Sequence, residues 1–250
     1  MGRKIAYFLE EVGGITSLFW QIILHIVRPP FKGKYIISQM LEIGVNTLPI
    51  ASIMAVFTGM VLAVQTYIKL REFNAETVVG GVVAASMCKE LGPVLTAIIV
   101  AGRIGSSTTA EIGSMKVTEQ IDALETLAVN PIKQLACPRF IASLIMLPCL
   151  TIYTDLIGIL GGYAVGVYRF SICSSIYVDN SISFVSPWDI LSGLIKAFFF
   201  GMIIIVIGCY KGFTTIGGAK GVGKATTSSV VISSILILVS NYFLTVLLYQ

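Results

Sequence analysis

Residues 190–210 read ILSGLIKAFFFGMIIIVIGCY and carry one charged side chain, Lys196. A helix needs about 20 consecutive apolar residues to cross the hydrocarbon core of a bilayer, so this stretch predicts a membrane-spanning helix. The composition of the whole chain agrees, because 56% of its 250 residues are hydrophobic and 12% are charged. Soluble domains contain roughly 25% charged residues. Lipid is therefore the main solvent to which this sequence is suited.

Four more stretches are long and apolar enough to span a bilayer. They are Ile43–Ile68, Val78–Val100, Phe140–Tyr168 and Ser228–Tyr249. The first contains Pro49 and Gly59, which a membrane helix tolerates when its neighbours satisfy the freed backbone groups. The third contains Pro148 and Asp155 and is long for one crossing, which indicates a kinked or tilted helix. The sequence predicts an all-α integral membrane protein with about five transmembrane helices, in which residues 43–249 form the bundle.

The N-terminal segment has helical periodicity but no uninterrupted apolar run long enough to span. Its apolar residues recur at Ile5, Phe8, Leu9, Val12 and Ile15. This spacing is typical of an amphipathic helix that lies in the membrane interface. Pro29 and Pro30 follow, and proline cannot continue a helix. We assign residues 1–34 to an interfacial helix and the elbow after it.

The longest polar stretch lies between Gly102 and Arg139 and is too polar to be embedded in lipid. We expect residues 103–139 to form a loop that carries its own short helices. Within it, VTEQIDALETL at residues 117–127 places Val117, Ile121 and Leu124 on one face of a helix. Thr118 is a weak candidate for its N-cap. A short amphipathic helix outside the bilayer is typical of a docking element.

Basic residues set the orientation, because Lys and Arg concentrate on the cytoplasmic side of membrane proteins. With a cytoplasmic N-terminus, twelve of the 17 fall on that side: Arg3, Lys4, Arg28, Lys32, Lys34, Arg103, Lys116, Lys133, Arg139, Lys211, Lys220 and Lys224. Lys69, Arg71 and Arg169 fall on the other side, and Lys89 and Lys196 lie within spans. We therefore expect the N-terminus and the loop at 103–139 to be cytoplasmic and the C-terminus to lie outside.

Several functions are disfavoured by the distribution of residue types. The basic residues form no stripe, so the net charge of +4 does not indicate a nucleic-acid partner. His25 is the only histidine, and the five cysteines are scattered without metal-ligand spacing. Residues 217–226, GGAKGVGKAT, nearly fit a phosphate-binding loop, but Ala225 has no hydroxyl for magnesium. We expect no catalytic residues, no metal site and no cofactor on this chain.

Four ionisable residues within the spans need an explanation: Lys89, Glu90, Asp155 and Lys196. Each charge in hydrocarbon costs at least a few kcal/mol, so each needs a partner or a wet cavity. One interpretation is pairing between helices, of Glu90 with Lys89 or Lys196. The other is a polar patch inside a substrate cavity. The spacing of Gly158, Gly162 and Gly166 likewise fits close packing within one chain or contact between two copies.

Several sequence blocks follow one another in a characteristic order. They are Lys89-Glu90-Leu91-Gly92-Pro93, Ala101-Gly102-Arg103-Ile104-Gly105, Ala110-Glu111-Ile112-Gly113 and Val117-Thr118-Glu119-Gln120-Ile121-Asp122-Ala123-Leu124. Later blocks are Pro138-Arg139-Phe140 and Lys224-Ala225-Thr226-Thr227, with Pro131 and Lys196 as isolated matches. Together these blocks resemble the MlaE (YrbE) permease family of ABC transporters. The resemblance covers nearly the whole chain, as a single permease domain, and is weakest before Glu42 and between Ser171 and Pro187.

The resemblance implies a permease of the bacterial inner membrane that forms a homodimer. It also implies two copies of a cytoplasmic ATPase, which would hold ATP and magnesium, and a periplasmic lipid-binding partner with an MCE domain. The implied substrate is phospholipid or a related lipid, and the implied role is to maintain the lipid asymmetry of the outer membrane. Contacts with the periplasmic partner cannot be carried over, because the segment around Asp179 shows little of the family pattern.

The resemblance also implies roles for particular residues. The family's coupling segment, which would transmit ATPase closure, matches Glu119, Gln120, Ile121, Asp122 and Leu124. Polar positions at the family's lipid cavity match Lys89, Glu90 and Lys196, and we expect Leu62, Val64 and Tyr67 to line that cavity for the acyl chains. The alternative function is a stand-alone secondary transporter of an amphipathic solute. That class normally needs more spans and an internal repeat, which the sequence does not show convincingly.

Overall fold

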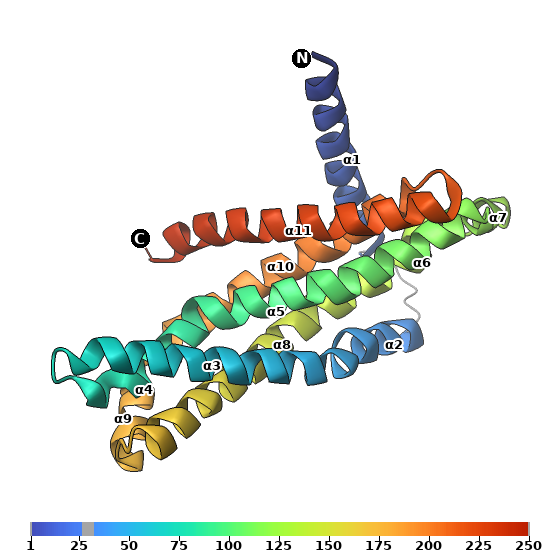
Figure 1. Ribbon diagram of the computed structural model, residues 1–250. Helices are drawn as coiled ribbons and strands as arrows, with labels where there is room; N and C mark the ends of the chain where they lie inside the picture. The colour runs from blue at the N-terminus through green and yellow to red at the C-terminus, as the bar shows by residue number, and fades with distance from the viewer. Residues whose placement is uncertain (1, 27–32, 250) are drawn as a thin grey trace. The chain divides into compact units, whose positions relative to one another are not determined.

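The computed structural model describes residues 2–26 and 33–249, and all of their regular structure is helical (Figure 1). The helices are α1 (Gly2–Ile26), α2 (Gly33–Ile43), α3 (Leu48–Arg71), α4 (Val79–Ser86), α5 (Gly92–Val100), α6 (Ser106–Val117), α7 (Gln120–Thr126), α8 (Cys137–Ala164), α9 (Ser174–Phe184), α10 (Pro187–Phe213) and α11 (Gly218–Tyr249). Single π-helical turns at Met87–Leu91, Ala101–Gly105, Ile132–Ala136 and Val165–Arg169 extend several of them. The predicted all-α class is confirmed.

Five helical runs in the described residues are long and apolar enough to cross a membrane. They are Gly33–Arg71, Glu76–Val117, Ile132–Arg169, Pro187–Phe213 and Gly218–Tyr249. Each contains one predicted span, so the expected set of five long apolar helices is confirmed. The N-terminal helix is also present as α1, with Leu18 and Ile22 buried and Trp20 exposed. Pro29 and Pro30, which were expected to end it, lie outside the described residues.

The polar sequence after Val100 suggested that the second membrane helix ends there, but the helix continues. Residues 102–117 continue the helix instead of starting a loop. One buried hydroxyl is satisfied inside the helical packing, because Thr109 Oγ1 donates to the backbone oxygens of Gly105 at 2.8 Å and Gly208 at 3.0 Å. This bond joins α6 to α10, whereas Ser107, Glu111 and Ser114 are exposed.

The predicted helix at residues 117–127 is shorter than expected. Val117 ends α6, and Thr118 is no N-cap, because its hydroxyl donates back to the carbonyl oxygen of Ser114 at 2.8 Å. Glu119 then turns the chain with a φ of +59°, and α7 begins at Gln120. Ile121 is buried and Leu124 half-buried, so part of the predicted apolar face remains.

The third crossing is α8, which contains Pro148 without a break and continues through a π-helical turn to Arg169. The polar segment after it holds a helix that was not predicted, α9. The glycines of α8 pack within the chain. A Cβ on Gly59 would overlap the backbone oxygen of Gly158, and a Cβ on Gly166 would come within 2.6 Å of the Tyr177 ring. The interpretation of these glycines as close packing within one chain is therefore the one that the structure supports.

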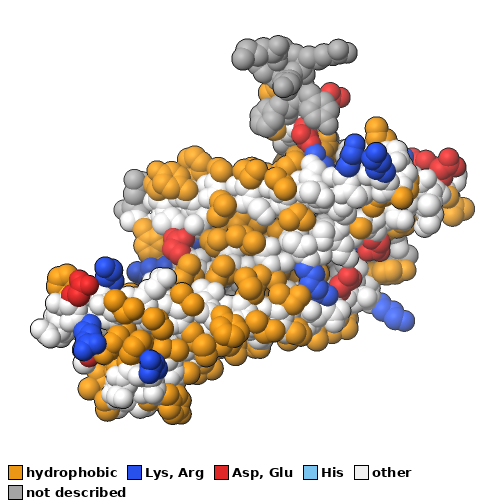
Figure 2. Space-filling model, viewed as in Figure 1, with side chains coloured by type: hydrophobic (Ala, Val, Ile, Leu, Met, Phe, Trp, Pro, Cys, Tyr) orange, Lys and Arg blue, Asp and Glu red, His pale blue; other side chains and the backbone are white. Residues whose placement is uncertain are grey.

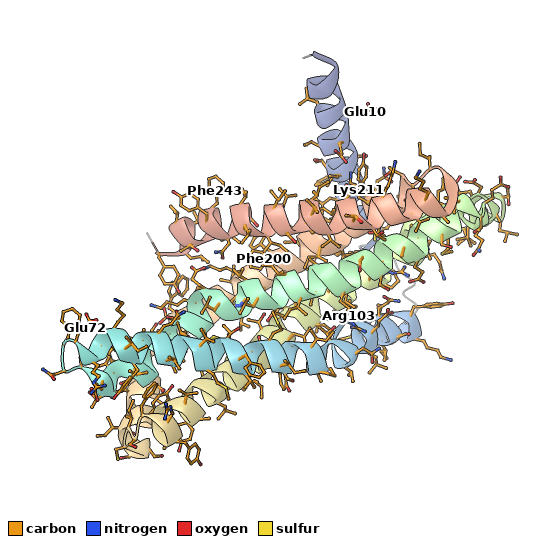
Figure 3. All side chains as sticks on the ribbon, in the orientation of Figure 1. Glu10, Glu72, Arg103, Phe200, Lys211 and Phe243 are labelled. Carbon is orange, nitrogen blue, oxygen red and sulfur yellow. The ribbon has the colours of Figure 1, made fainter. Side chains whose placement is uncertain are left out.

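The chain divides into two compact units. Unit 1 comprises residues 1–43, 100–145 and 200–239, and unit 2 comprises 44–99, 146–199 and 240–250. Within unit 1, the Lys211 ammonium pairs with the Glu11 carboxylate, which joins α10 to α1. Figure 3 labels Lys211 on α10. The guanidinium of Arg103 donates to the Glu42 backbone oxygen at 3.2 Å, at the end of α2.

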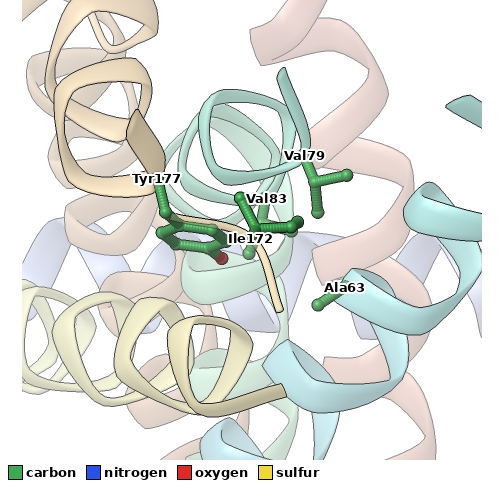
Figure 4. Close-up of a cluster of buried hydrophobic side chains, with 5 residues drawn as sticks. All are labelled: Ala63, Val79, Val83, Ile172 and Tyr177. Atoms are coloured by element: carbon green, nitrogen blue, oxygen red, sulfur yellow. The ribbon is translucent and has the colours of Figure 1, made fainter. Parts of the chain in front are cut away.

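A buried apolar cluster holds α3, α4 and α9 together in unit 2 (Figure 4). Its five members are Ala63, Val79, Val83, Ile172 and Tyr177. Charged side chains gather elsewhere, beside α7 and the start of α11 and beside the turn from α3 to α4, whereas apolar side chains cover the flanks of the helices (Figure 2). That distribution matches helices solvated by lipid along their flanks and by water near their ends.

The contact of Gly59 with Gly158 gives a test of this packing. We expect Gly59→Ala to lower the free energy of unfolding by about 1–3 kcal/mol, because the added methyl group forces α3 away from α8. Thermal unfolding of the purified protein in mild detergent would measure it. Gly13→Ala is the matched control, because nothing lies within 4 Å of a Cβ at that position. Equal stability of the two variants would contradict the close approach.

Candidate functional site

Lys196 is the central cation of the site. Its side chain lies in α10 and is wholly buried, and its ammonium donates to Glu90 Oε1 at 2.6 Å. The same ammonium donates to the backbone oxygen of Lys89 at 2.9 Å. Lys89 and Glu90 both belong to the π-helical turn Met87–Leu91, which follows α4. The pairing of Glu90 with Lys196, one of the two partners expected from the sequence, is confirmed.

Glu90 also binds two side chains of α11. Thr245 donates its hydroxyl to Oε1 at 2.8 Å, and the Asn241 amide donates to Oε2 at 2.8 Å. Both carboxylate oxygens are therefore bound, and one carboxylate joins the π-helical turn to α10 and α11. A half-buried carboxylate that accepts several charge-assisted bonds is held in one orientation.

Lys89 pairs with Asp189 and not with Glu90. The Lys89 ammonium lies 3.2 Å from Asp189 Oδ1, and the two side chains are 38% and 6% exposed. Asp189 also accepts the backbone N–H of Ser186 at 3.0 Å and the hydroxyl of Tyr249 at 3.3 Å. The Tyr249 ring lies 5.5 Å from the Lys89 ammonium and 5.9 Å from that of Lys196. Such aromatic contacts stabilise partly desolvated cations.

These four charged groups form one neutral network, which we define as Lys89, Glu90, Asp189 and Lys196. Two cations oppose two anions, so the cost of bringing each charge out of water is offset within the group. Lys196 and Asp189 are buried, whereas the side chains of Lys89 and Glu90 stay more than a third exposed. The network therefore joins the π-helical turn to α10 and α11 and leaves the side chains of Lys89 and Glu90 partly exposed.

The apolar residues predicted to line a lipid cavity lie in two different places. Leu62 lines a groove of about 460 Å³ on α3, and Leu91, the neighbour of Glu90 in sequence, also lines it. The other lining residues are Ile53, Met54, Phe57, Thr58, Val61 and Gln65. Val64 and Tyr67 do not line this groove. The Tyr67 ring is stacked on Phe170 with centroids 3.8 Å apart, packed against the buried cluster of unit 2.

The predicted coupling residues surround the turn from α6 to α7. Lys116 pairs with Asp122 at 2.7 Å, which ties α7 to the end of α6. Ile121 is buried and lines a pocket of about 500 Å³ with Leu18 of α1 and Tyr210 of α10. Glu119 and Gln120 are exposed. The geometry anchors α7 by one apolar side chain and leaves its first residues accessible.

The sequence did not single out Asp189 as a member of the network. It also did not single out the polar groups around the network, which are Asn241, Thr245, Tyr249 and Ser192, the partner of the Tyr249 hydroxyl. A signal for two of them was present. Asn241 is an amide in the apolar run of α11, and Thr245 lies four residues later, on the same helix face. Polar residues in such a run usually face a polar partner. Residues 218–226, which nearly fit a phosphate-binding loop, form the first turns of α11.

Comparison with known proteins gives consistent results. A family model described as Permease MlaE matches residues 36–247. A probable ABC transporter permease protein of Rickettsia prowazekii is 49% identical over 100% of this chain and 96% of its own length. A corresponding protein of Synechocystis is 43% identical over 99% and 94%. The intermembrane phospholipid transport system permease protein MlaE of Haemophilus influenzae is 37% identical over 100% and 96%.

A double-mutant cycle tests whether the network acts as a unit. Lys196→Met should lower the free energy of unfolding by about 3–5 kcal/mol, because it leaves Glu90 without its cation. Adding Glu90→Gln should restore part of that loss. Unfolding of the purified variants in detergent would measure the coupling.

The exposed pair of Arg71 and Glu76, 3.7 Å apart, provides the matched control. Its cycle of Arg71→Gln and Glu76→Gln should give a coupling below about 1 kcal/mol. Additive effects of Lys196→Met and Glu90→Gln would contradict the network.

Proposed function

This chain belongs to the MlaE family of ABC transporter permeases, and on that premise we propose that it moves phospholipid, or a related lipid, between the inner membrane and a periplasmic MCE-domain partner. It is a transport subunit, and ATP hydrolysis is assigned to a cytoplasmic ATPase that would hold ATP and magnesium. The work of the complex would contribute to the lipid asymmetry of the outer membrane. The observation that carries the proposal is that the π-helical turn Met87–Leu91 supplies both Lys89 and Glu90 to the neutral charged network and Leu91 to the lining of an apolar groove.

The two parts of a phospholipid suit the two parts of this site. Acyl chains are apolar and would lie in the groove lined by Leu62 and Leu91. The phosphate would approach Lys89, whose ammonium is paired with Asp189 and whose side chain is 38% exposed. Lys196, being wholly buried, would instead hold Glu90 in place. The name of the Haemophilus relative, at 37% identity, supports phospholipid as the cargo.

The turn from α6 to α7 would receive the movement of the ATPase. Glu119 and Gln120 are exposed and would contact it, while the Lys116–Asp122 pair would carry the displacement into α6. The helical run Glu76–Val117 contains both α6 and Glu90. One continuous helix would thus connect the coupling segment to the charged network.

A second copy of the chain would cover α11. The most apolar window of this helix is 11% buried, less than that of any other span. Phe243, which projects from α11 in Figure 3, is 65% exposed, and Leu238 is 54% exposed. A homodimer is therefore part of the proposal. The distribution of basic residues supports a cytoplasmic N-terminus and a periplasmic C-terminus, which are also part of the proposal.

Affinity purification of the tagged chain in mild detergent, followed by mass spectrometry of proteins and lipids, tests the assembly. We expect an ATPase, an MCE-domain protein and phospholipid to co-purify. Recovery of the chain alone, even after crosslinking, would overturn the ABC assembly. It would favour instead a stand-alone transporter of an amphipathic solute.

The role of Lys89 is tested by transfer of labelled phospholipid in the reconstituted complex. Lys89→Met should slow transfer about tenfold, because the phosphate loses a charge-assisted hydrogen bond. ATP hydrolysis should persist, and Lys89→Arg should keep most of the transfer. Lys69→Met removes an exposed lysine outside the network and should transfer lipid normally. Normal transfer by Lys89→Met would refute the assignment of the headgroup to this cation.

A further inference from the structure

Unit 2 contains a second groove, and none of the residues that line it belongs to the charged network. Its volume is about 360 Å³, and four helical elements contribute to it: the end of α4 with the π-helical turn after it, α8, α9 and the start of α10. Its lining includes Cys88, Asp155, Leu156, Ile159, Ser181 and Ile182. The only acidic side chain among all the lining residues is that of Asp155.

Asp155 has no partner in the described part of the chain. Its side chain is buried, with 8% of the residue exposed, and Oδ1 has no hydrogen-bond partner among the described residues. The ion pairs found there do not include it either. The neighbouring Ser181 hydroxyl is already used, because it donates to the Tyr177 backbone oxygen at 2.8 Å.

The backbone makes room for this carboxyl group. A Cβ on Gly92 would overlap Asp155 Oδ1, so any residue other than glycine at position 92 would displace the acid. Gly92 follows Leu91 directly after the π-helical turn of the charged network. Oδ1 therefore packs against the backbone at Gly92, which is not among the lining residues of the groove, and a ligand in the groove can meet only the part of the carboxyl group that lines it.

The apolar surroundings determine which chemical form of Asp155 is compatible with the groove. An unpaired carboxylate in such a site would cost several kcal/mol, so the acid is neutral and its O–H is available as a donor. The complementary ligand has an apolar body and an acceptor oxygen. Rim residues Ile182 and Leu156 are 71% and 57% exposed, so in a membrane they contact lipid chains.

We propose that this groove binds one acyl chain of a glycerolipid and that Asp155 donates a hydrogen bond to the ester carbonyl oxygen of that chain. The volume is near the small end of ligand pockets and accommodates a chain, whereas a partner helix is 10–12 Å wide with its side chains. The site is additional to the transport site proposed above. It would hold a resident lipid beside α8 and α9.

Photolabelling tests this site. The probe is phosphatidylethanolamine with a diazirine in one acyl chain, mixed at increasing mole fraction into native membrane vesicles that contain the full-length protein. Labelled peptides are mapped by mass spectrometry. We expect labelling at Leu156 and Ile182 that saturates with probe and is competed by unlabelled phosphatidylethanolamine.

Two substitutions of Asp155 test whether the site needs a hydrogen-bond donor at this position. Asp155→Asn keeps a hydrogen-bond donor and should retain the saturable labelling, whereas Asp155→Leu should lower it about five- to tenfold. Val185→Trp fills the groove with the acid intact and should also abolish it. Labelling of the Leu62 groove is the internal control for folding and should stay unchanged in all three.

Three outcomes would overturn the proposal. Equal loss in Asp155→Asn and Asp155→Leu would mean that an ionised carboxylate binds a cationic ligand. Labelling that rises linearly with probe, and is the same in every variant, would mean boundary lipid only. Retention of saturable labelling in Asp155→Leu would remove Asp155 from the site. None of these results depends on whether Lys89→Met slows transfer, so the two assignments fail separately.

Discussion

Charge neutrality in an apolar environment is the constraint on which unit 2 depends. Lys196 is wholly buried, and it is compatible with a membrane span only because Glu90 lies 2.6 Å away. Glu90 in turn binds Asn241 and Thr245, so the pair determines where α11 lies against the π-helical turn and α10. Removing any member leaves a partner unsatisfied, which costs more than the pair itself contributes.

Small residues make this neutralisation possible, because they bring the helices close enough. Gly193, on α10, lies so near the π-helical turn that a Cβ would overlap the Cys88 backbone oxygen. The turn carries Lys89 and Glu90, and Lys196 follows Gly193 by three residues, on the same helix face. Without a hydrophobic force between helices in lipid, packing and hydrogen bonds hold them together. Gly193 therefore brings α10 close to the π-helical turn, and the Glu90–Lys196 pair then holds the two together.

The sequence predicted features that depend on one helix alone, such as the position of a span. It did not predict features that depend on contacts with residues far away in the sequence. Residues 190–210 lie within α10 because a long apolar run has no other stable form in lipid. The Glu90–Lys196 pair was among the expected pairs because buried charges need opposites. Residues 102–117 were misassigned, since the bond from Thr109 to Gly208 spans 99 positions. Asp189 was missed because its partner, Lys89, is 100 residues away. Tyr67 was expected in the lipid cavity but stacks on Phe170, a contact that leaves no local pattern in the sequence.

The neutrality of the network also bears on how a cargo would leave it. Under the proposed function, a phosphate that reaches Lys89 meets a cation that is already paired with Asp189. The two cations and two anions of the network already neutralise one another, so the network has no excess positive charge to balance the phosphate. Binding would therefore be weaker than at a cluster of unpaired cations. A site for transport must bind its cargo firmly enough to admit it and loosely enough to release it. The partly exposed Lys89 next to the buried Asp189 suits that compromise. Its ammonium can exchange the Asp189 carboxylate for the lipid phosphate, so its charge always has an anionic partner.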